Sequence, residues 1–187
     1  MTKTQQKGFT LLELLIVIAI LAVLATVAVL VINPVEYLRQ ARDLQRIGDL
    51  GAVKGAIDLY LTTATSTDLT VGVTGNAARC MVGVASPFAM NAGVCVQNTT
   101  RLTDGTGWVL VNLGLTTAGS PLTTLPVDPT NSATYFYAYA ANETANTYEL
   151  NAKLESAKFM TDQDIDGTDG GNQAAWYEIG NEPGLDL

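Results

Sequence analysis

The stretch that decides the fold is Phe9–Ile32, which reads FTLLELLIVIAILAVLATVAVLVI. Apart from Thr10, Glu13 and Thr26, every residue in it is apolar. A helix of about 20 apolar residues spans the hydrocarbon core of a bilayer, so this stretch predicts one transmembrane helix. The short segment before it carries two lysines. The positive-inside rule therefore predicts a cytoplasmic N-terminus and an exported remainder.

A cleavable secretory signal is the alternative interpretation of the same stretch. Such signals have an apolar core of about 7–15 residues and end at an A-x-A-like cleavage site. The apolar stretch here is longer, and its sequence contains no such site before Asn33. The pattern therefore favours a helix that stays in the mature protein.

Glu13 is the exceptional residue of the apolar stretch. A carboxylate within a membrane helix costs at least a few kcal/mol, and such residues usually have a function. Glu13 could also reach the headgroups from its place near the helix start. That alternative does not explain why an acid occupies a position where leucine would insert better.

The composition weakens most enzyme hypotheses. The 187 residues include no histidine, which removes Ser-His-Asp and Cys-His catalysis and HExxH zinc sites. Two cysteines are too few for a tetrahedral thiolate zinc site. The formal net charge of −8 argues against a broad nucleic-acid-binding face. The sequence contains no P-loop, so it does not predict nucleotide hydrolysis.

The run from Lys7 to Glu13, KGFTLLE, followed by the apolar helix, resembles the class III leader and N-terminus of type IV pilins and pseudopilins. The resemblance implies that a prepilin peptidase cuts between Gly8 and Phe9 and methylates the new amine of Phe9. It also implies that Glu13 pairs with the terminal amine of a neighbouring subunit during assembly. The physics agrees, because an ammonium and a carboxylate in a filament core of low dielectric each need the other.

The resemblance implies a structural subunit and not an enzyme. Such a subunit is stored in the inner membrane, clipped, and polymerised with itself into an extracellular helical pilus filament. A separate assembly ATPase and a platform protein are implied as partners, and no specific nucleic acid is predicted. Two alternatives stay open: a major pseudopilin of a type II secretion system, and a surface binding module or enzyme that the helix merely tethers.

We expect an α+β fold of the type IV pilin kind, with a long N-terminal helix packed on a small antiparallel β-sheet and a disulfide-containing loop. Five segments follow from the sequence: a cleaved leader at 1–8, a transmembrane and filament-core helix at 9–32, the amphipathic half of the helix at 33–61, a variable loop at 62–107, and a sheet head with an acidic C-terminal loop at 108–187.

A proline at Pro34 interrupts the helical pattern, and proline inside a helix removes a hydrogen bond and bends it. An apolar stripe nevertheless continues to about Leu61. We therefore expect one long helix with a kink at Pro34, and the alternative is that the helix ends there. Three arginines share one side of the second half: Arg39, Arg42 and Arg46. They are expected to be solvated or to meet acids on adjacent subunits.

The variable loop contains Cys80 and Cys95. A disulfide is the expected state outside the membrane, and a bridge across a loop of this length would contribute about 3 kcal/mol. Two free thiols are the alternative.

Farther along the chain, Trp108–Leu113 is interpreted as a strand or an edge of the core. The run LPVDPTN at 125–131 is interpreted as a turn segment similar to one that precedes the sheet in major pseudopilins and in many Gram-positive-type pilins. The alternating runs Tyr135–Tyr139 and Thr147–Leu154 predict an antiparallel hairpin. A third strand is expected from Trp176–Ile179.

The loop that begins at Asp162 reads DQDIDGTDG and matches the first half of an EF-hand-like calcium loop. Side-chain ligands would be Asp162, Asp164 and Asp166, with the carbonyl of Thr168 at position 7. The usual glutamate at position 12 is absent, so Glu178, Asp169 or a backbone carbonyl would have to complete the shell of one Ca²⁺ ion, and Glu178 is the residue we name. Major pseudopilins and some pilins carry a calcium site in this region, and the alternative is an ordinary solvated turn.

Overall fold

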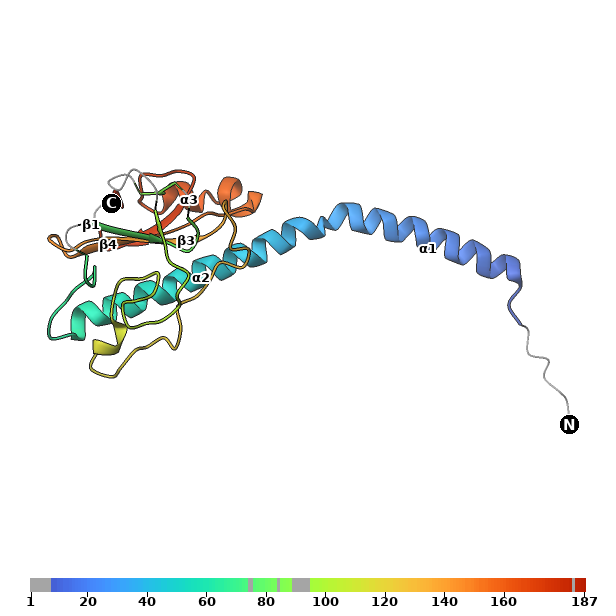
Figure 1. Ribbon diagram of the computed structural model, residues 1–187. Coiled ribbons are helices and arrows are strands. Elements are labelled where there is room, and N and C mark those ends of the chain that lie inside the picture. Colours follow the sequence, from blue (N-terminus) through green and yellow to red (C-terminus); the bar gives the residue numbers. More distant parts are fainter. Residues whose placement is uncertain (1–7, 74–75, 84, 89–94, 183) are drawn as a thin grey trace, which may run out of the picture. The chain divides into compact units, whose positions relative to one another are not determined.

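The computed structural model describes residues 8–73, 76–83, 85–88, 95–182 and 184–187. The chain forms two compact units, Met1–Leu38 and Arg39–Leu187. The helices and strands, in chain order, are α1 (Leu11–Ile32), α2 (Pro34–Thr63), β1 (Asn76–Cys80), β2 (Val96–Gln97), a 3-10 turn η1 (Leu113–Leu115), β3 (Tyr137–Asn142), β4 (Thr147–Ala152), a π-helical turn η2 (Lys158–Asp162), α3 (Ile165–Thr168) and β5 (Tyr177–Gly180) (Figure 1).

The first unit consists mainly of α1, which is 22 residues long. Its large apolar side chains are exposed, with Leu15, Leu21 and Val27 all more than half exposed. The helical run that contains it is long and apolar enough to cross a membrane, judged by length and composition within the described residues. The predicted apolar helix therefore forms, and its own chain does not cover it.

One residue separates α1 from α2. Asn33 adopts a left-handed conformation, with φ 47° and ψ 68°, and ends α1. Pro34 is then the first residue of α2, a position that suits proline because its missing N–H would have no partner in the helix. The interruption is thus a helix end followed by a new helix start.

In the second unit, α2 packs against one face of the sheet. Its buried apolar side chains repeat every three or four residues: Leu50, Val53, Ile57 and Tyr60. Two tyrosine hydroxyls from the sheet donate hydrogen bonds to acids on this helix, from Tyr137 to Asp49 at 2.8 Å and from Tyr148 to Asp58 at 2.5 Å. Tyr137 and Tyr148 therefore belong to the packing between helix and sheet.

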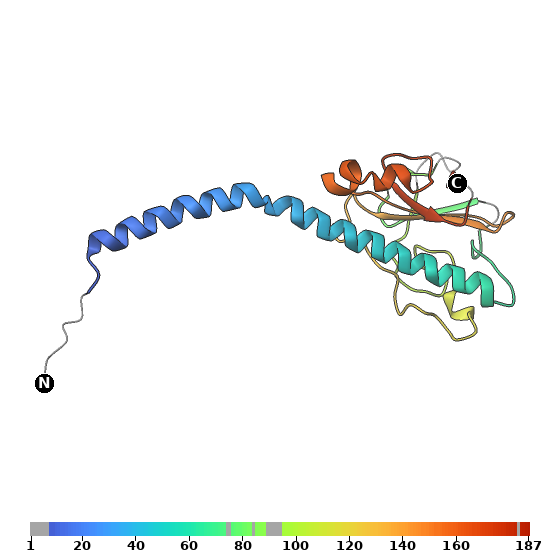
Figure 2. The ribbon, with the colours of Figure 1, turned by 180° about the vertical axis from the view of Figure 1, so that it is seen from behind.

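The five strands are ordered β2-β1-β3-β4-β5, and every neighbouring pair except β1 and β2 is antiparallel. The predicted hairpin is formed by β3 and β4, with Tyr139 opposite Leu150. The predicted third strand is β5, which pairs with β4. Figures 1 and 2 show α2 along one face of the sheet and α3 with the C-terminal segment on the other. The expected α+β, pilin-like fold class is confirmed.

The segment Trp108–Leu113 belongs to the core but is not a strand. Its backbone is irregular, and consecutive residues such as Val109, Leu110 and Val111 are all buried, so the in–out alternation of a strand is absent. The indole N–H of Trp108 donates to the carbonyl of Pro126 at 3.0 Å. This contact joins the segment to the proline-rich turn.

The predicted disulfide joins Cys80, the last residue of β1, to Cys95, which directly precedes β2. Both cysteines are buried. The bridge therefore holds the short edge strand β2 beside β1. Both of these strands lie within residues 62–107, the predicted variable loop.

Candidate functional site

The start of α1 is held by a reciprocal capping box between Thr10 and Glu13. The Thr10 hydroxyl accepts a hydrogen bond from the Glu13 N–H at 3.2 Å. The Glu13 carboxylate accepts from the Thr10 N–H and hydroxyl, each at 3.3 Å. These bonds satisfy N–H groups that a helix start leaves without partners.

Gly8 and Phe9 lie before this cap, outside the helix. Both are exposed, and Phe9 has 88% of its surface accessible. Thr10 itself has an extended backbone, with φ −79° and ψ 151°. The expected cleavage bond between Gly8 and Phe9 therefore lies in exposed, non-helical chain. The Glu13 carboxylate is close to this bond, because it accepts a hydrogen bond from the N–H of Thr10, the residue after Phe9.

Residues 3–29 match the family profile described as the prokaryotic N-terminal methylation motif. This segment is the leader of the type IV pilin and pseudopilin class. The prepilin leader points to a structural subunit that is anchored in a membrane and processed by a prepilin peptidase, and it does not separate a pilus subunit from a pseudopilin. Searches of curated proteins and of solved structures found no match.

The second unit contains a buried ion network around Arg46. Its guanidinium contacts Asp43 at 2.8 Å, Asp128 at 2.6 Å and Glu155 at 2.7 Å, and its side chain is 0% exposed. Arg42 pairs with the same Glu155 at 2.6 Å. For Arg46, the expectation of a solvated side chain or a contact with a neighbouring subunit is wrong, because three acids of its own chain surround it. Arg42 pairs with Glu155 of its own chain and keeps 34% of its side chain exposed.

The network fixes two segments to α2. Asp128 also accepts hydrogen bonds from the N–H groups of Thr130 and Asn131, at 2.8 and 3.0 Å. Asp43 accepts from the N–H of Ser156 at 2.8 Å. Sequence reasoning missed the pairing, although the acid of the LPVDPTN run was its visible signal.

The network also sets the ionisation of its members. Burial alone would lower the pKa of Arg46, but hydrogen bonds to Asp128 and Glu155 outweigh it and raise that pKa. The hydrogen bond from Arg42, followed by the one from Arg46, lowers the pKa of Glu155. Arg46 and Glu155 therefore each favour their charged forms within the cluster.

The acidic loop places its three predicted side-chain ligands in different surroundings. Asp162 and Asp164 are exposed, whereas Asp166 in α3 is 4% exposed. Asp164 has a left-handed backbone, and its carboxylate covers Gly167 so closely that a Cβ there would lie 2.5 Å from Oδ1. No three Asp, Glu, Cys or His side chains gather to hold a metal within the described ranges.

Asp166 is the residue of this loop that most resembles an unfilled ligand. Its Oδ1 atom is buried and has no hydrogen-bond partner among the described residues. Burial, followed by the charges of Asp164 and Asp169, raises its pKa. A cation would relieve both costs. The donor chemistry suits calcium, while the shell is not assembled in this conformation.

Glu178 already accepts hydrogen bonds from its own chain, whereas the ligand predicted at Thr168 is the backbone carbonyl and the side chain makes a separate contact. The Thr168 hydroxyl donates to the Asp164 carbonyl at 2.6 Å. Glu178 is buried and accepts from the Gln173 N–H at 2.8 Å and from the Asn151 side chain at 3.3 Å. Calcium binding by this set stays a prediction.

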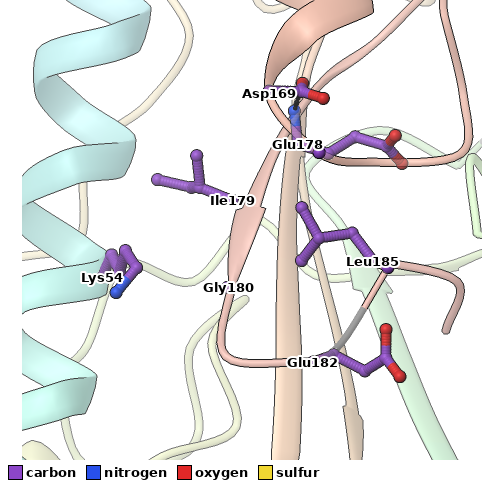
Figure 3. A pocket seen from close by; sticks show the side chains of 9 residues that line it. Lys54, Asp169, Glu178, Ile179, Gly180, Glu182 and Leu185 are labelled. Atoms are coloured by element: carbon purple, nitrogen blue, oxygen red, sulfur yellow. Dashed lines mark hydrogen bonds between the residues drawn. The ribbon is translucent and has the colours of Figure 1, made fainter.

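A pocket of about 300 Å³ lies at the edge strand β5 (Figure 3). Asp169, Glu178 and Glu182 line it, together with Lys54 from α2. Asp169 accepts a hydrogen bond from the outward N–H of Glu178 at 2.6 Å. This contact covers a free backbone donor, which limits edge-to-edge pairing of the sheet.

Glu149 is a buried acid that the sequence did not single out. It lies on β4, and its carboxylate accepts from the N–H of Leu187 at 3.0 Å. Burial, with the neighbouring Glu178, raises its pKa to about 8. The in–out alternation of β4 places Glu149 on the face opposite Tyr148 and Leu150, and the sequence alone predicts that this face is solvated.

Proposed function

We propose that this chain is the structural subunit of a type IV pilus, clipped between Gly8 and Phe9 and polymerised into an extracellular helical filament. The observation that carries the proposal is the methylation motif at residues 3–29 on a 22-residue apolar helix. The helix is exposed along its length. The helix needs an apolar environment both before and after assembly.

Polymerisation would supply that environment. In the membrane, α1 lies in lipid with its N-terminus in the cytoplasm, and in the filament it enters a bundle of identical helices. Its apolar surface then never meets water. A head-to-tail contact that does not close into a ring produces an open helical fibre. Prepilin peptidase, an assembly ATPase and a platform protein are the partners that this route requires.

Glu13 is proposed to fix the register of that assembly. Removal of the leader would leave a methylated amine on Phe9, and Glu13 of a neighbouring subunit would pair with it. A charge in an apolar bundle needs a partner, so subunits with matched charges are favoured over slipped ones. The short spacing between Phe9 and Glu13 supports this proposal, because both groups lie at the same end of α1.

A calcium ion is proposed for the acidic loop, with Asp162, Asp164, Asp166, Thr168 and Glu178 as its ligands. The buried, unpartnered Oδ1 of Asp166 supports it. Calcium takes 6–8 oxygen ligands in flexible geometry, so exposed aspartates could close around an ion after it binds. Its contribution would be to neutralise an acidic loop and hold it against the sheet.

The nearest alternative is a major pseudopilin of a type II secretion system. The LPVDPTN segment and the proposed calcium loop favour it, because both are similar to features of major pseudopilins. A tethered surface module is the other alternative. The pilus-subunit and pseudopilin hypotheses both require that subunits polymerise through α1, whereas the tethered-module hypothesis does not.

Electron microscopy of material sheared from the producing cells, combined with mass analysis of its N-terminus, tests the proposal. We expect long fibres built from chains that begin with N-methyl-Phe9. Short or absent fibres with the same processed terminus would favour a pseudopilin. Unprocessed chains that stay in the membrane fraction would contradict both filament readings.

A further inference from the structure

The capping box at the start of α1 lies within a single chain, so it forms before any neighbour is present. The Thr10 carbonyl accepts the bond from the Leu14 N–H at 3.2 Å, which makes Thr10 the N-cap. Gly8 and Phe9 precede it in non-helical backbone. The proposed function gives Glu13 and Phe9 a role but leaves Thr10 without one.

We propose that Thr10 is a positioning residue for leader cleavage. Its hydroxyl makes the helix begin at Leu11, and the Gly8–Phe9 bond is therefore presented to the peptidase as non-helical, exposed chain. This inference rests on the proposed function, since it assumes that this bond is cut. The peptidase would hydrolyse the amide: water adds across the C–N bond, so Gly8 ends in a carboxylate and Phe9 begins with an amine.

The physical reason is a competition between cap and helix. A helix gains one hydrogen bond for each residue by which it extends, and α1 could extend backward over Thr10 and Phe9. The Gly8 carbonyl would then accept the Leu12 N–H, and a helical turn would enclose the bond to be cut. The Thr10 hydroxyl accepts a hydrogen bond from the Glu13 N–H at 3.2 Å. This capping bond opposes lengthening of the helix, because it requires the β-type backbone conformation of Thr10.

The test measures the initial rate of leader removal from the full-length chain by a prepilin peptidase in detergent micelles. Thr10→Val keeps the side-chain shape but removes the hydroxyl. Because loss of an N-cap shifts a helix-start equilibrium by about five-fold, the rate should fall by about that factor. Thr10→Ser and Thr10→Asn retain capping oxygens and should be cut at close to the wild-type rate.

Thr26→Val is the matched control, since Thr26 is the other threonine of α1 and its hydroxyl bonds the Ala22 carbonyl at 2.8 Å. Its rate should equal that of the wild type. A second readout is the Cα chemical shift of residue 10. The shift should have the value typical of extended backbone in the wild type and in Thr10→Asn, and the value typical of a helix in Thr10→Val.

Equal cleavage of Thr10→Val and wild type would overturn the inference. So would a Thr10→Asn chain that is cut as slowly as Thr10→Val, because the peptidase would then be recognising the threonine side chain itself and not the capped backbone. If the wild-type chain is never cut at Gly8–Phe9, the proposed function fails as well. Uniform cutting of all variants overturns the role of Thr10 alone.

Discussion

Arg46 and Asp128 form a two-point ion pair that is sealed from solvent. The Arg46 Nε lies 2.6 Å from Oδ2 and its Nη2 lies 3.1 Å from Oδ1, and both side chains are 0% exposed. The two residues are 82 positions apart in the chain. Their pairing therefore fixes the proline-rich turn to α2 by electrostatics as well as by packing.

Asp128→Ala should strongly destabilise the second unit. The substitution leaves Arg46 buried with one fewer counter-charge and removes the acceptor of the Thr130 and Asn131 N–H groups. Breaking a buried ion pair costs about 3–5 kcal/mol. Urea unfolding of the full-length chain in detergent measures this, and Asp186→Ala, at an exposed acid, is the control. Equal midpoints for the two variants would contradict the prediction.

Loss of the disulfide should have a comparable effect. The bridge joins Cys80 and Cys95, 15 residues apart, and a loop of that size stabilises a fold by about 3 kcal/mol when it is closed. The Cys80→Ser, Cys95→Ser double variant should show that loss in denaturant midpoint. Reducing agent should shift the wild type but not the variant. A reducing agent with no effect on either would show that the bridge does not form.

The elements with strong local patterns could be predicted from the sequence. The apolar run of α1, the alternation of β3 and β4, and the pair of cysteines each gave the observed structure. Trp108–Leu113 could not be resolved in the same way, because an irregular buried segment and a buried strand share the same apolar composition.

The ion network and the buried acids depended on tertiary contacts. Arg46 looks like any surface arginine of an amphipathic helix until Asp128 is brought to it from 82 residues away. Glu149 likewise appears solvated in sequence, and it is buried because the C-terminal segment covers its face of the sheet. The acid of the LPVDPTN run is visible in the sequence, but nothing near Arg46 links the two residues, so their pairing needed the structure.

Glu149 should make the second unit more stable in acid than in base. Burial, with Glu178 beside it, raises its pKa from 4.5 to about 8. The folded chain therefore holds a proton that the unfolded chain releases. The resulting stability is complete below about pH 4.5 and declines as the pH rises to about 8. Urea midpoints measured across this range in the presence of a chelator should fall for the wild type.

Glu149→Gln provides the comparison for that titration. Glutamine keeps the shape and an acceptor oxygen but cannot lose a proton, so the decline between acid and base should become shallower. An unchanged slope in the variant would show that another group carries the dependence. Glu143→Gln, at an exposed acid in the β3–β4 turn, should leave the slope as it is in the wild type.

Calcium should stabilise the wild type through Asp166. Adding the ion should raise the melting temperature, and EDTA should reverse the change, because a ligand that binds the folded state stabilises it. Asp166→Asn removes the buried, unpartnered charge and should abolish the response to calcium. Asp186→Asn should respond as the wild type does. Identical melting with calcium and with EDTA, and no metal after purification, would mean that the loop is an ordinary acidic turn.

Glu13→Gln should separate a filament subunit from a tethered module. Glutamine still accepts the Thr10 N–H, so the capping box and the start of α1 are retained. The charge is lost, and the Phe9 amine of a neighbouring subunit then enters the apolar bundle without a counter-charge. We expect normal leader removal and normal membrane insertion, with fibre yield reduced by at least about ten-fold, the equivalent of 1.4 kcal/mol per contact.

Fibre counts by electron microscopy and leader removal by mass analysis give the two readouts. Thr26→Val, also in α1, should assemble normally. Wild-type fibre yield from Glu13→Gln would remove Glu13 from the assembly mechanism and leave α1 as an anchor.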